Sequence, residues 1–258
     1  MEHRNHRDKQ EYALVTGASG GIGLEIAGAL AGRGYGIIMV SANADRLAAA
    51  KARLEARLPG TQAVAVAQDL SLPGAAQTLH EKAKALGAPV AVLVNNAGFG
   101  ITGKAADTPL AADEGMLAVN VTALVGLSKL FLADMAARRR GHILNVASKG
   151  AYQPGPYTAA YFASKAFVLS YTRALRYEAK EAGVRVSALC PGAVDTGFFE
   201  REGQPVPKGA LPARRVAEKA VDGLMQGREV ICVPWTVRLL PLVPEKLRMR
   251  VVAGMKRP

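Results

Sequence analysis

The amino-acid sequence predicts an α/β fold, a single doubly wound domain with a seven-stranded parallel sheet and helices on both faces. Short apolar runs rich in β-branched residues alternate with longer amphipathic segments along the chain, as expected when helices cover both faces of a sheet. No linker, compositional break or internal repeat divides the 258 residues. Strand–helix–strand order of this kind implies parallel strands joined by right-handed crossovers.

The predicted strands are the short apolar runs. In chain order they are Tyr12–Thr16, Gly36–Val40, Ala63–Ala67, Val90–Val94, His142–Ala147, Val184–Leu189 and Glu229–Val233. The segments between them have the alanine- and leucine-rich composition of helices. Two examples are Ala44–Leu58, which Pro59 and Gly60 end, and Leu72–Leu86.

The composition bounds the class of protein. Half of the residues are hydrophobic and 21% are charged, which suits one large domain with a substantial core. We expect a flexible basic lead at residues 1–10, one folded domain at 11–234, and a basic extension at 235–258. Two cysteines, Cys190 and Cys232, are too few for a disulfide framework and indicate a reducing compartment.

The sequence gives no sign of secretion or membrane insertion. Its start, MEHRNHRDKQ, lacks the apolar core of a signal peptide. We find no uninterrupted apolar run of about 20 residues, the length that spans a bilayer. A cytoplasmic protein is therefore expected.

The net charge is +12, which admits nucleic acid, an anionic membrane or a phosphorylated small molecule as a partner. Residues 238–258 carry six Lys and Arg against one Glu, and Arg138–Arg140 form a second basic cluster. No zinc-finger spacing or RNA-binding aromatic pattern accompanies these charges. We interpret them as solvated faces and expect no nucleic-acid partner.

A helix over Glu245–Met255 would place Leu247, Val251 and Met255 on one apolar stripe. Basic amphipathic helices bind anionic membranes, but this stripe is narrow and has no aromatic anchor. We therefore expect the extension to dock on the protein's own body or on a neighbouring subunit. Contact with a membrane surface is the alternative.

A glycine-rich turn follows the first strand. Thr16-Gly17-Ala18-Ser19-Gly20-Gly21-Ile22-Gly23 leads into the helical segment LEIAGALAGRG. Glycines in such a turn allow close approach of the backbone to a pyrophosphate and tight helix–strand contact. The phosphates then lie at a helix N-terminus, where free N–H groups and the dipole favour anions. This context favours a Rossmann-type dinucleotide site over an ordinary loop.

Three motifs occur in a set order: G-x-x-x-G-x-G, then Asn95-Asn96-Ala97-Gly98, then Tyr161-Phe162-Ala163-Ser164-Lys165. From about Tyr12 to Val233 the chain therefore resembles the short-chain dehydrogenase/reductase family. The resemblance implies an NAD(P)(H)-dependent oxidoreductase that transfers hydride between a nicotinamide and a carbonyl/alcohol substrate, in the reductase direction. It also implies a homodimer or homotetramer, formed through the helices that carry Asn120 and Tyr161.

The resemblance also implies the site residues. The implied catalytic residues are Asn120, Ser148, Tyr161 and Lys165. The implied cofactor contacts are Gly17, Ser19, Gly20, Gly21, Ile22, Gly23, Asp69, Leu70, Asn96, Ala97, Gly98, Tyr161, Lys165, Pro191, Gly192, Val194 and Thr196.

The four catalytic candidates suit this chemistry. Tyr161 and Lys165 are one helical turn apart and share a face. An ammonium beside a phenol, whose pKa is ordinarily about 10, favours the phenolate. Ser148 can hydrogen-bond a carbonyl oxygen, and Asn120 can hold a water that relays protons to Lys165. Each alone could be a packing or capping residue; together they favour catalysis over a non-catalytic nucleotide-sensing or interaction protein on the same fold.

The end of the second strand bears on the form of the cofactor. A carboxylate there would bind the ribose 2′-hydroxyl of NAD, whereas basic or small polar groups suit a 2′-phosphate. Ser41 and Asn43 stand there without an acid, and we expect them to contact the cofactor, with NADP(H) favoured over NAD(H). Arg46 could bind the phosphate or be an ordinary surface residue, and Ala42 stands where many NADP-dependent relatives carry arginine.

Other chemistries have little support. The four histidines lack metal-ligand spacing, so no metal is expected, and no nucleophile elbow with a catalytic serine is expected either. The two cysteines are interpreted as small core residues. The segments expected to border the substrate pocket offer aromatic and apolar surface with no obvious anion clamp; they are residues 150–157, Phe198-Phe199 and residues 234–241.

Overall fold

The structure, a computed structural model, describes residues 10–201 and 203–257. Most of the expected N-terminal lead, residues 1–9, lies outside the described residues. One seven-stranded parallel sheet forms the centre, in the order β3-β2-β1-β4-β5-β6-β9. Its strands are β1 (Tyr12–Thr16), β2 (Gly36–Ser41), β3 (Ala63–Ala67), β4 (Val90–Asn95), β5 (Gly141–Val146), β6 (Val184–Pro191) and β9 (Val230–Val233). The seven predicted strands are thus confirmed.

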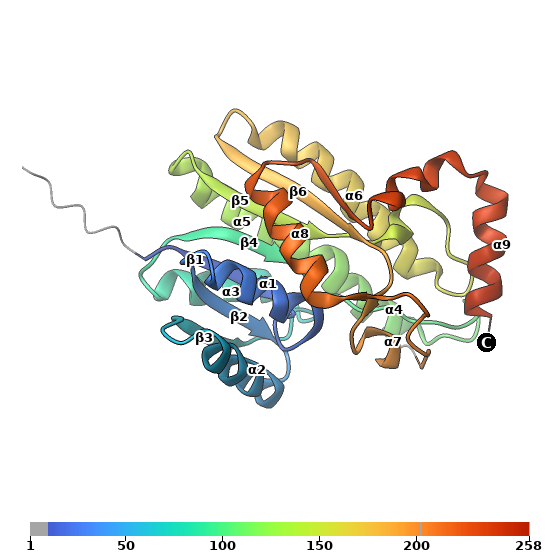
Figure 1. Cartoon of the computed structure of the whole chain (residues 1–258), viewed down its shortest axis with the longest axis horizontal. Coiled ribbons are helices and arrows are strands. Elements are labelled where there is room, and N and C mark those ends of the chain that lie inside the picture. The colour runs from blue at the N-terminus through green and yellow to red at the C-terminus, as the bar shows by residue number, and fades with distance from the viewer. Residues whose placement is uncertain (1–9, 202, 258) are drawn as a thin grey trace, which may run out of the picture.

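Helices cover both faces of this sheet (Figure 1). One face carries α1 (Gly21–Ala31), α2 (Ala44–Arg57) and α8 (Ala213–Met225); the other carries α3 (Ala75–Ala85), α5 (Leu124–Ala137) and α6 (Ala159–Ala179). Neighbouring residues of one strand point to opposite faces. Within β1, Val15 therefore packs in the α1 layer and Leu14 in the α3 layer, and both are fully buried.

The strand order reverses direction at β1, whose two neighbours are β2 and β4. In open parallel sheets a ligand binds at such a switch point, beyond the carboxyl ends of the strands. The glycine-rich turn after β1 and the Asn-Asn-Ala-Gly segment after β4 both lie at this edge. The topology therefore brings the two predicted cofactor loops together.

One long helical stretch packs against the sheet. α4 (Leu110–Leu117), the π-helical segment η1 (Ala118–Ala123) and α5 run on as 28 helical residues, long and apolar enough to cross a membrane. This stretch is not the uninterrupted apolar run that the sequence analysis looked for, because Asn120, Thr122 and Lys129 interrupt it. Leu127, Phe131 and Met135 of this stretch are buried against the sheet, so we interpret it as a core helix.

Smaller elements close the carboxyl edge. β7 (Val194–Asp195) pairs with β8 (Leu211–Pro212), and α7 (Phe198–Arg201) lies between them. The short 3₁₀ segment η2 (Lys149–Tyr152) follows β5. After β9, η3 (Trp235–Leu242) leads to α9 (Glu245–Lys256), which lies at one end of the molecule in Figure 1.

The C-terminal extension docks on the protein's own body, but not through the predicted stripe. Val252 is 2% exposed, and Arg248 donates a hydrogen bond to the carbonyl oxygen of Tyr152 in η2. Leu247, Val251 and Met255 are 53–56% exposed in the single chain. Val252 therefore anchors α9, and it lies on a face of the helix next to the predicted stripe.

Candidate active site

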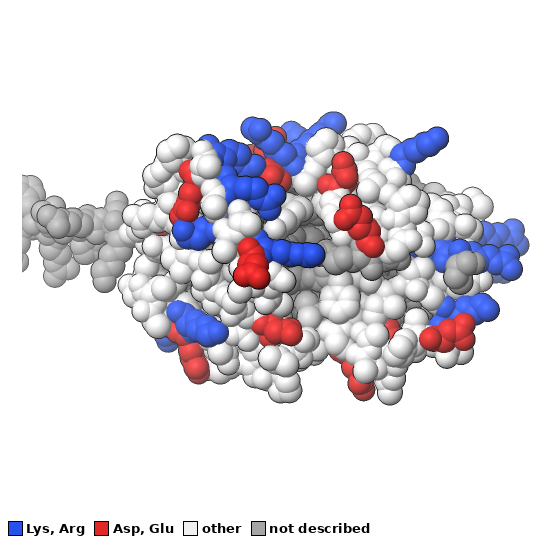
Figure 2. All heavy atoms as spheres, turned by 90° about the horizontal axis from the view of Figure 1, so that it is seen from below, with Lys and Arg blue, Asp and Glu red and all other residues white. Residues whose placement is uncertain are grey.

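A cavity of about 1260 Å³ runs along the carboxyl edge of the sheet. Most of the predicted site residues line it; they are Gly17, Ser19, Gly20, Gly21, Ile22, Ser41, Asp69, Leu70, Asn96, Ala97, Gly98, Ser148, Tyr161, Lys165, Pro191, Gly192, Val194 and Thr196. The face shown in Figure 2 is hollowed near its centre, and basic side chains gather at the end where α9 lies in Figure 1. Three predicted residues, Gly23, Asn43 and Asn120, do not line the cavity.

The glycine turn has little room for side chains. Gly17 and Gly21 have φ of +67° and +54°, in the left-handed region that favours glycine. A Cβ on Gly23 would lie 2.3 Å from the carbonyl oxygen of Gly17. Gly23 therefore serves the close contact of α1 with the turn, and its direct contact with the cofactor stays a prediction. The open space beside Gly20, with nothing within 4 Å of an added Cβ, suits a pyrophosphate at the start of α1.

Thr16 ties the two cofactor loops together, a role the sequence analysis missed. Its Oγ1 accepts hydrogen bonds from the backbone N–H groups of Asn96 at 3.0 Å and Ala97 at 2.9 Å. In return, Asn96 Nδ2 donates to the carbonyl oxygens of Thr16 at 2.9 Å and Gly17 at 3.3 Å. These bonds fix the loop after β4 against the turn after β1.

The ends of β1 and β2 form a small polar patch. Ser41 Oγ donates to Ser19 Oγ at 3.0 Å, and both line the cavity together with Ala42 and Arg46. Asn43 instead caps α2, because its side-chain oxygen accepts the N–H of Arg46 at 2.8 Å. Asn43 therefore does not line the cavity, and contact of its side chain with the cofactor stays a prediction. Arg46 lines the cavity, as the phosphate-binding alternative for this residue requires.

The loop after β3 turns about Asp69. The carboxylate of Asp69 accepts the backbone N–H of Ser71 at 2.9 Å and its hydroxyl at 2.7 Å. This leaves Leu70, 7% exposed, in the cavity wall. An apolar side chain beside a polar turn suits the flat base of a nucleotide.

The reactive end of the cavity is built on α6. Lys165 is buried, and its Nζ donates to the carbonyl oxygen of Val146 at 2.9 Å. The same Nζ lies 5.8 Å from the centroid of the Tyr161 ring. Burial lowers the pKa of Lys165 to about 8. A cation held beside the phenol by the fold is the arrangement that an acid–base tyrosine requires.

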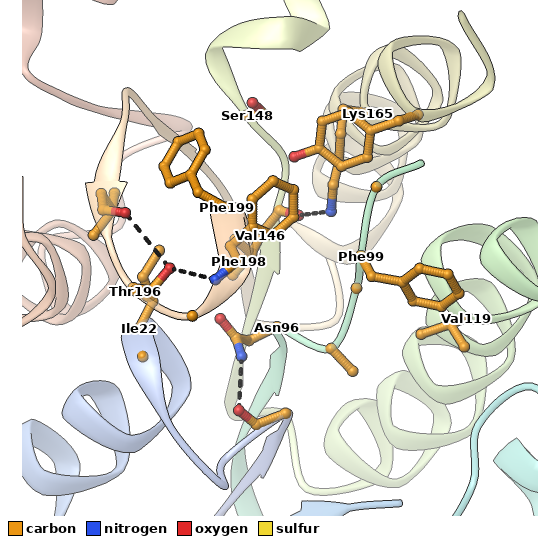
Figure 3. A pocket seen from close by; sticks show the side chains of 18 of the residues that line it. Ile22, Asn96, Phe99, Val119, Val146, Ser148, Lys165, Thr196, Phe198 and Phe199 are labelled. Carbon is orange, nitrogen blue, oxygen red and sulfur yellow. Dashed lines mark hydrogen bonds between the residues drawn. The ribbon is translucent and has the colours of Figure 1, made fainter. Parts of the chain in front are cut away.

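Ser148 ends the segment after β5. Its Oγ accepts the backbone N–H of Gly150 at 3.0 Å, which caps η2 and leaves the hydroxyl in the cavity wall. In Figure 3, Ser148 and Lys165 lie on one side of the cavity and Asn96 and Ile22 on the other. The distance between these sides gives room for a cofactor and a substrate together.

Asn120 lies behind the cavity wall, within the π-helical segment η1. Its Nδ2 donates to the carbonyl oxygen of Phe99 at 3.0 Å and to Ser164 Oγ at 3.1 Å, while its Oδ1 accepts the N–H of Phe99 at 3.2 Å. The carboxamide is thus engaged with protein partners. Asn120 thereby positions the Phe99 backbone, and a water held by Asn120 that relays protons to Lys165 stays a prediction.

Aromatic side chains surround the space next to Tyr161. The Tyr161 ring centroid lies 5.6 Å from that of Phe198 and 5.9 Å from that of Phe162. Phe198 and Phe199 come from α7, as expected, and Figure 3 shows Phe99 across the cavity from them. Residues of α9 complete this end of the cavity; they are Val252, Met255 and Lys256.

The remaining groups give no second site. The described residues hold no cluster of His, Cys, Asp and Glu fit for a metal ion. Cys190 and Cys232 are free thiols in register on β6 and β9. Cys190 is buried, in agreement with a packing role.

Fold and site together define a dinucleotide-dependent oxidoreductase with a tyrosine–lysine pair. Comparison with known proteins agrees: the family model of short chain dehydrogenases matches residues 11–206. The chain therefore belongs to the short-chain dehydrogenase/reductase family and is an NAD(P)-dependent oxidoreductase acting on a CH–OH/C=O group. The non-catalytic alternative is not favoured.

Two named relatives illustrate the similarity. The chain is 37% identical over 216 residues to 1-deoxy-11-beta-hydroxypentalenate dehydrogenase from Streptomyces exfoliatus, covering 83% of this chain and 77% of that protein. It is 35% identical over 214 residues to the ketoacyl reductase HetN from Nostoc, covering 82% and 74%.

Solved structures share the fold. A short-chain dehydrogenase from Sphingobium yanoikuyae in complex with NADPH matches with a TM-score of 0.83 and 26% identity, over 96% of this chain and 97% of that one. A family member from Burkholderia phymatum in complex with NAD matches with a TM-score of 0.83 and 26% identity, over 94% and 95%. Both forms of the cofactor thus occur among similar structures.

Proposed function

We propose that this protein is an NADP(H)-dependent reductase of bulky, apolar ketones or aldehydes. The observation that carries the reaction is the buried Lys165 beside Tyr161, in a cavity that also contains the glycine turn. The aromatic and aliphatic side chains around Tyr161 support an apolar substrate; they are Phe99, Phe162, Phe198, Phe199, Val252 and Met255.

In this mechanism the protein binds and orients the reactants and handles the proton. Ser148 Oγ–H donates to the substrate carbonyl oxygen, and the Tyr161 hydroxyl protonates that oxygen as it gains charge. The Lys165 ammonium stabilises the phenolate that remains. When bound, the nicotinamide supplies the hydride. Holding both reactants side by side makes hydride transfer an oriented intramolecular step.

The preference for NADP(H) is supported by the polar patch at the ends of β1 and β2. Ser19 and Ser41 offer hydroxyls 3.0 Å apart, and Arg46 offers a guanidinium in the same wall. A guanidinium is a strong, geometrically specific partner of a phosphate. Among the described residues lining this patch there is no carboxylate to bind a free ribose 2′-hydroxyl.

Two further expectations belong to the proposal. We infer a homodimer or homotetramer formed through η1 and α6, because apolar side chains are exposed on α6 and on α4, which directly precedes η1; they are Leu110, Leu117, Phe167 and Tyr177. The proposed location is the cytoplasm, in keeping with the two free thiols.

Titration of NADPH and NADH into the purified protein, followed by a panel of ketones and aldehydes, tests this function. We expect NADPH to bind more tightly and to be oxidised with bulky apolar carbonyl compounds. Equal or reversed affinities would show that the reading of the polar patch is wrong. If NADPH binds but no compound of the panel is reduced, the result counts against the proposed reaction.

A further inference from the structure

Lys149 is a cation without a partner in the cavity wall. It directly follows Ser148 and begins η2, and it is only partly exposed. Its ammonium forms no hydrogen bond or ion pair with any residue in the described part of the chain. Removing an ammonium from water without an anionic partner is costly, so this position calls for an anion from outside the chain.

A second cation faces the same space. Lys256, from α9, lines the cavity, and its Nζ lies 5.9 Å from the ring centroid of Phe199. The hydrogen bond from Arg248 to Tyr152 fastens α9 to η2 and so holds the two lysines near each other. Burial, together with the charge of Lys256, lowers the pKa of Lys149 below its ordinary value.

No acidic residue in the described part of the cavity wall pairs with Lys149. The acidic residues of this wall are Asp69 and Glu200. Asp69 bonds Ser71 in the loop after β3. The Glu200 carboxylate turns back toward Gly197, 3.7 Å from where a Cβ of Gly197 would stand, and forms no hydrogen bond or ion pair with Lys149. The charge of Lys149 therefore has no acidic partner among the described residues of the cavity wall.

We propose that Lys149 binds a carboxylate of the substrate, so that the enzyme acts on bulky, apolar oxo acids. The proposal rests on the proposed reductase function. Neighbouring Cα atoms are about 3.8 Å apart, so a carboxylate on Lys149 belongs to the same molecule as a carbonyl held by Ser148. The apolar part of that molecule lies against Phe198, Phe199 and the α9 residues Val252 and Met255.

Binding measured by calorimetry on the NADP⁺-saturated protein tests the anion site without turnover. The probes are decanoate, decanamide and decyl phosphate. We expect decanoate to bind at least about tenfold more tightly than decanamide, as a hydrogen bond to a charged group implies. Lys149→Met should remove this preference and Lys149→Arg should keep most of it. Lys246→Met is the matched control, because Lys246 is exposed on α9 and outside the cavity wall.

Equal or undetectable binding of decanoate and decanamide by the wild-type protein overturns the proposal, as does a preference that survives in Lys149→Met. Decyl phosphate bound more than about tenfold tighter than decanoate overturns the carboxylate assignment and points to a phosphorylated substrate instead.

Turnover separates this proposal from the proposed reaction. With 4-oxodecanoate and its methyl ester, wild type should favour the acid in kcat/KM by about tenfold, and Lys149→Met should lose that preference through KM. If neither compound is reduced while Lys149 still determines decanoate binding, the reductase function fails and the anion site stands. If both are reduced equally by wild type, the anion site fails and the reductase function stands.

Discussion

The ammonium of Lys165 donates a hydrogen bond to the carbonyl oxygen of Val146 at 2.9 Å, two residues before Ser148. This bond joins the first turns of α6 to the end of β5. It therefore holds the lysine–tyrosine pair of one element against the serine of another. The same burial that makes the bond possible lowers the pKa of Lys165 to about 8.

The first prediction is that turnover falls as the pH rises through about 8, because Lys165 then loses the charge that stabilises the Tyr161 phenolate. The profile of kcat against pH measures this. Lys165→Arg should shift the falling limb to higher pH, since a guanidinium keeps its charge. If the falling limb of the profile stays at the same pH in Lys165→Arg, a group other than Lys165 causes the fall in kcat.

The effect of Lys165 on stability has the opposite sign. Its pKa is lower in the folded chain than the ordinary 10.5, so the unfolded chain binds more protons between about pH 8 and 10.5. The contribution of this group to the free energy of unfolding therefore rises with pH in that window. Denaturant titrations of wild type and Lys165→Met across the window should diverge in that direction, with wild type gaining relative to the variant.

The second prediction concerns Tyr161. Tyr161→Phe should lower kcat by roughly 10²–10⁴-fold, the usual cost of losing a general acid, while the affinity for NADPH stays nearly unchanged. Tyr177→Phe on the same helix is the control, since Tyr177 is 85% exposed and outside the cavity wall. Turnover close to wild type in Tyr161→Phe would refute the assigned proton donor.

The third prediction concerns the form of the cofactor. Arg46→Ala should weaken NADPH binding by about tenfold or more, the loss expected for a charge-assisted hydrogen bond, and leave NADH binding unchanged. Arg53→Ala is the control, because Arg53 is exposed on the same helix and does not line the cavity. Fluorescence titration measures both affinities. A parallel loss of NADH affinity would show that Arg46 does not act on the 2′-phosphate.

The fourth prediction compares two glycines of one turn. In Gly23→Ala the new Cβ would lie 2.3 Å from the backbone oxygen of Gly17, so either α1 or the turn must shift. We expect a loss of about 1–3 kcal/mol in the free energy of unfolding, as for other overpacked sites. Gly20→Ala should leave the melting temperature of the cofactor-free protein unchanged, since its φ of 176° is extended and nothing lies within 4 Å. Equal melting temperatures for both variants would contradict the packing role of Gly23.

Much of the fold could be predicted from local sequence. The central strands of a doubly wound sheet are apolar on both faces, so runs such as Gly36–Val40 stand out, and the glycine turn is constrained by backbone geometry. The sequence did not mark the long α4–η1–α5 stretch because polar residues interrupt its apolar sequence, among them the buried Asn120 and the exposed Thr122.

Side-chain roles that depend on tertiary contacts were harder to predict. By type, the Asn43 carboxamide can donate to a phosphate through Nδ2 or cap a helix through Oδ1, and only the tertiary structure shows that Oδ1 accepts the Arg46 N–H. Asn120 was placed correctly on a helix near Lys165, but the Phe99 backbone that occupies its carboxamide is 21 residues away. Lys149 and Lys256 come from segments far apart in the chain, so no local sequence pattern predicts that they lie near each other.

The fifth prediction concerns the C-terminal extension. Truncation after Pro244 removes the buried Val252, the Arg248–Tyr152 hydrogen bond and the α9 wall of the cavity. Burial of one valine side chain contributes about 1.5–3 kcal/mol, so the melting temperature should fall by roughly 5 °C. KM for a bulky substrate should rise as well, because Val252 and Met255 leave the pocket. Calorimetry and steady-state kinetics measure the two effects.

The exposed stripe of α9 is tested separately from its buried face. We expect Leu247 and Val251 to be covered by a neighbouring subunit, so Leu247→Glu with Val251→Glu should lower the molar mass in sedimentation and leave the Val252 contact in place. Lys246→Glu is the control for added negative charge on the same helix. The wild-type protein should not sediment with anionic vesicles, because the stripe is narrow and basic side chains alone attract membranes weakly. The opposite outcome is strong, salt-sensitive binding of the wild-type protein to the vesicles, which the double variant loses while its molar mass is unchanged. That outcome would show that this face of α9 binds a membrane.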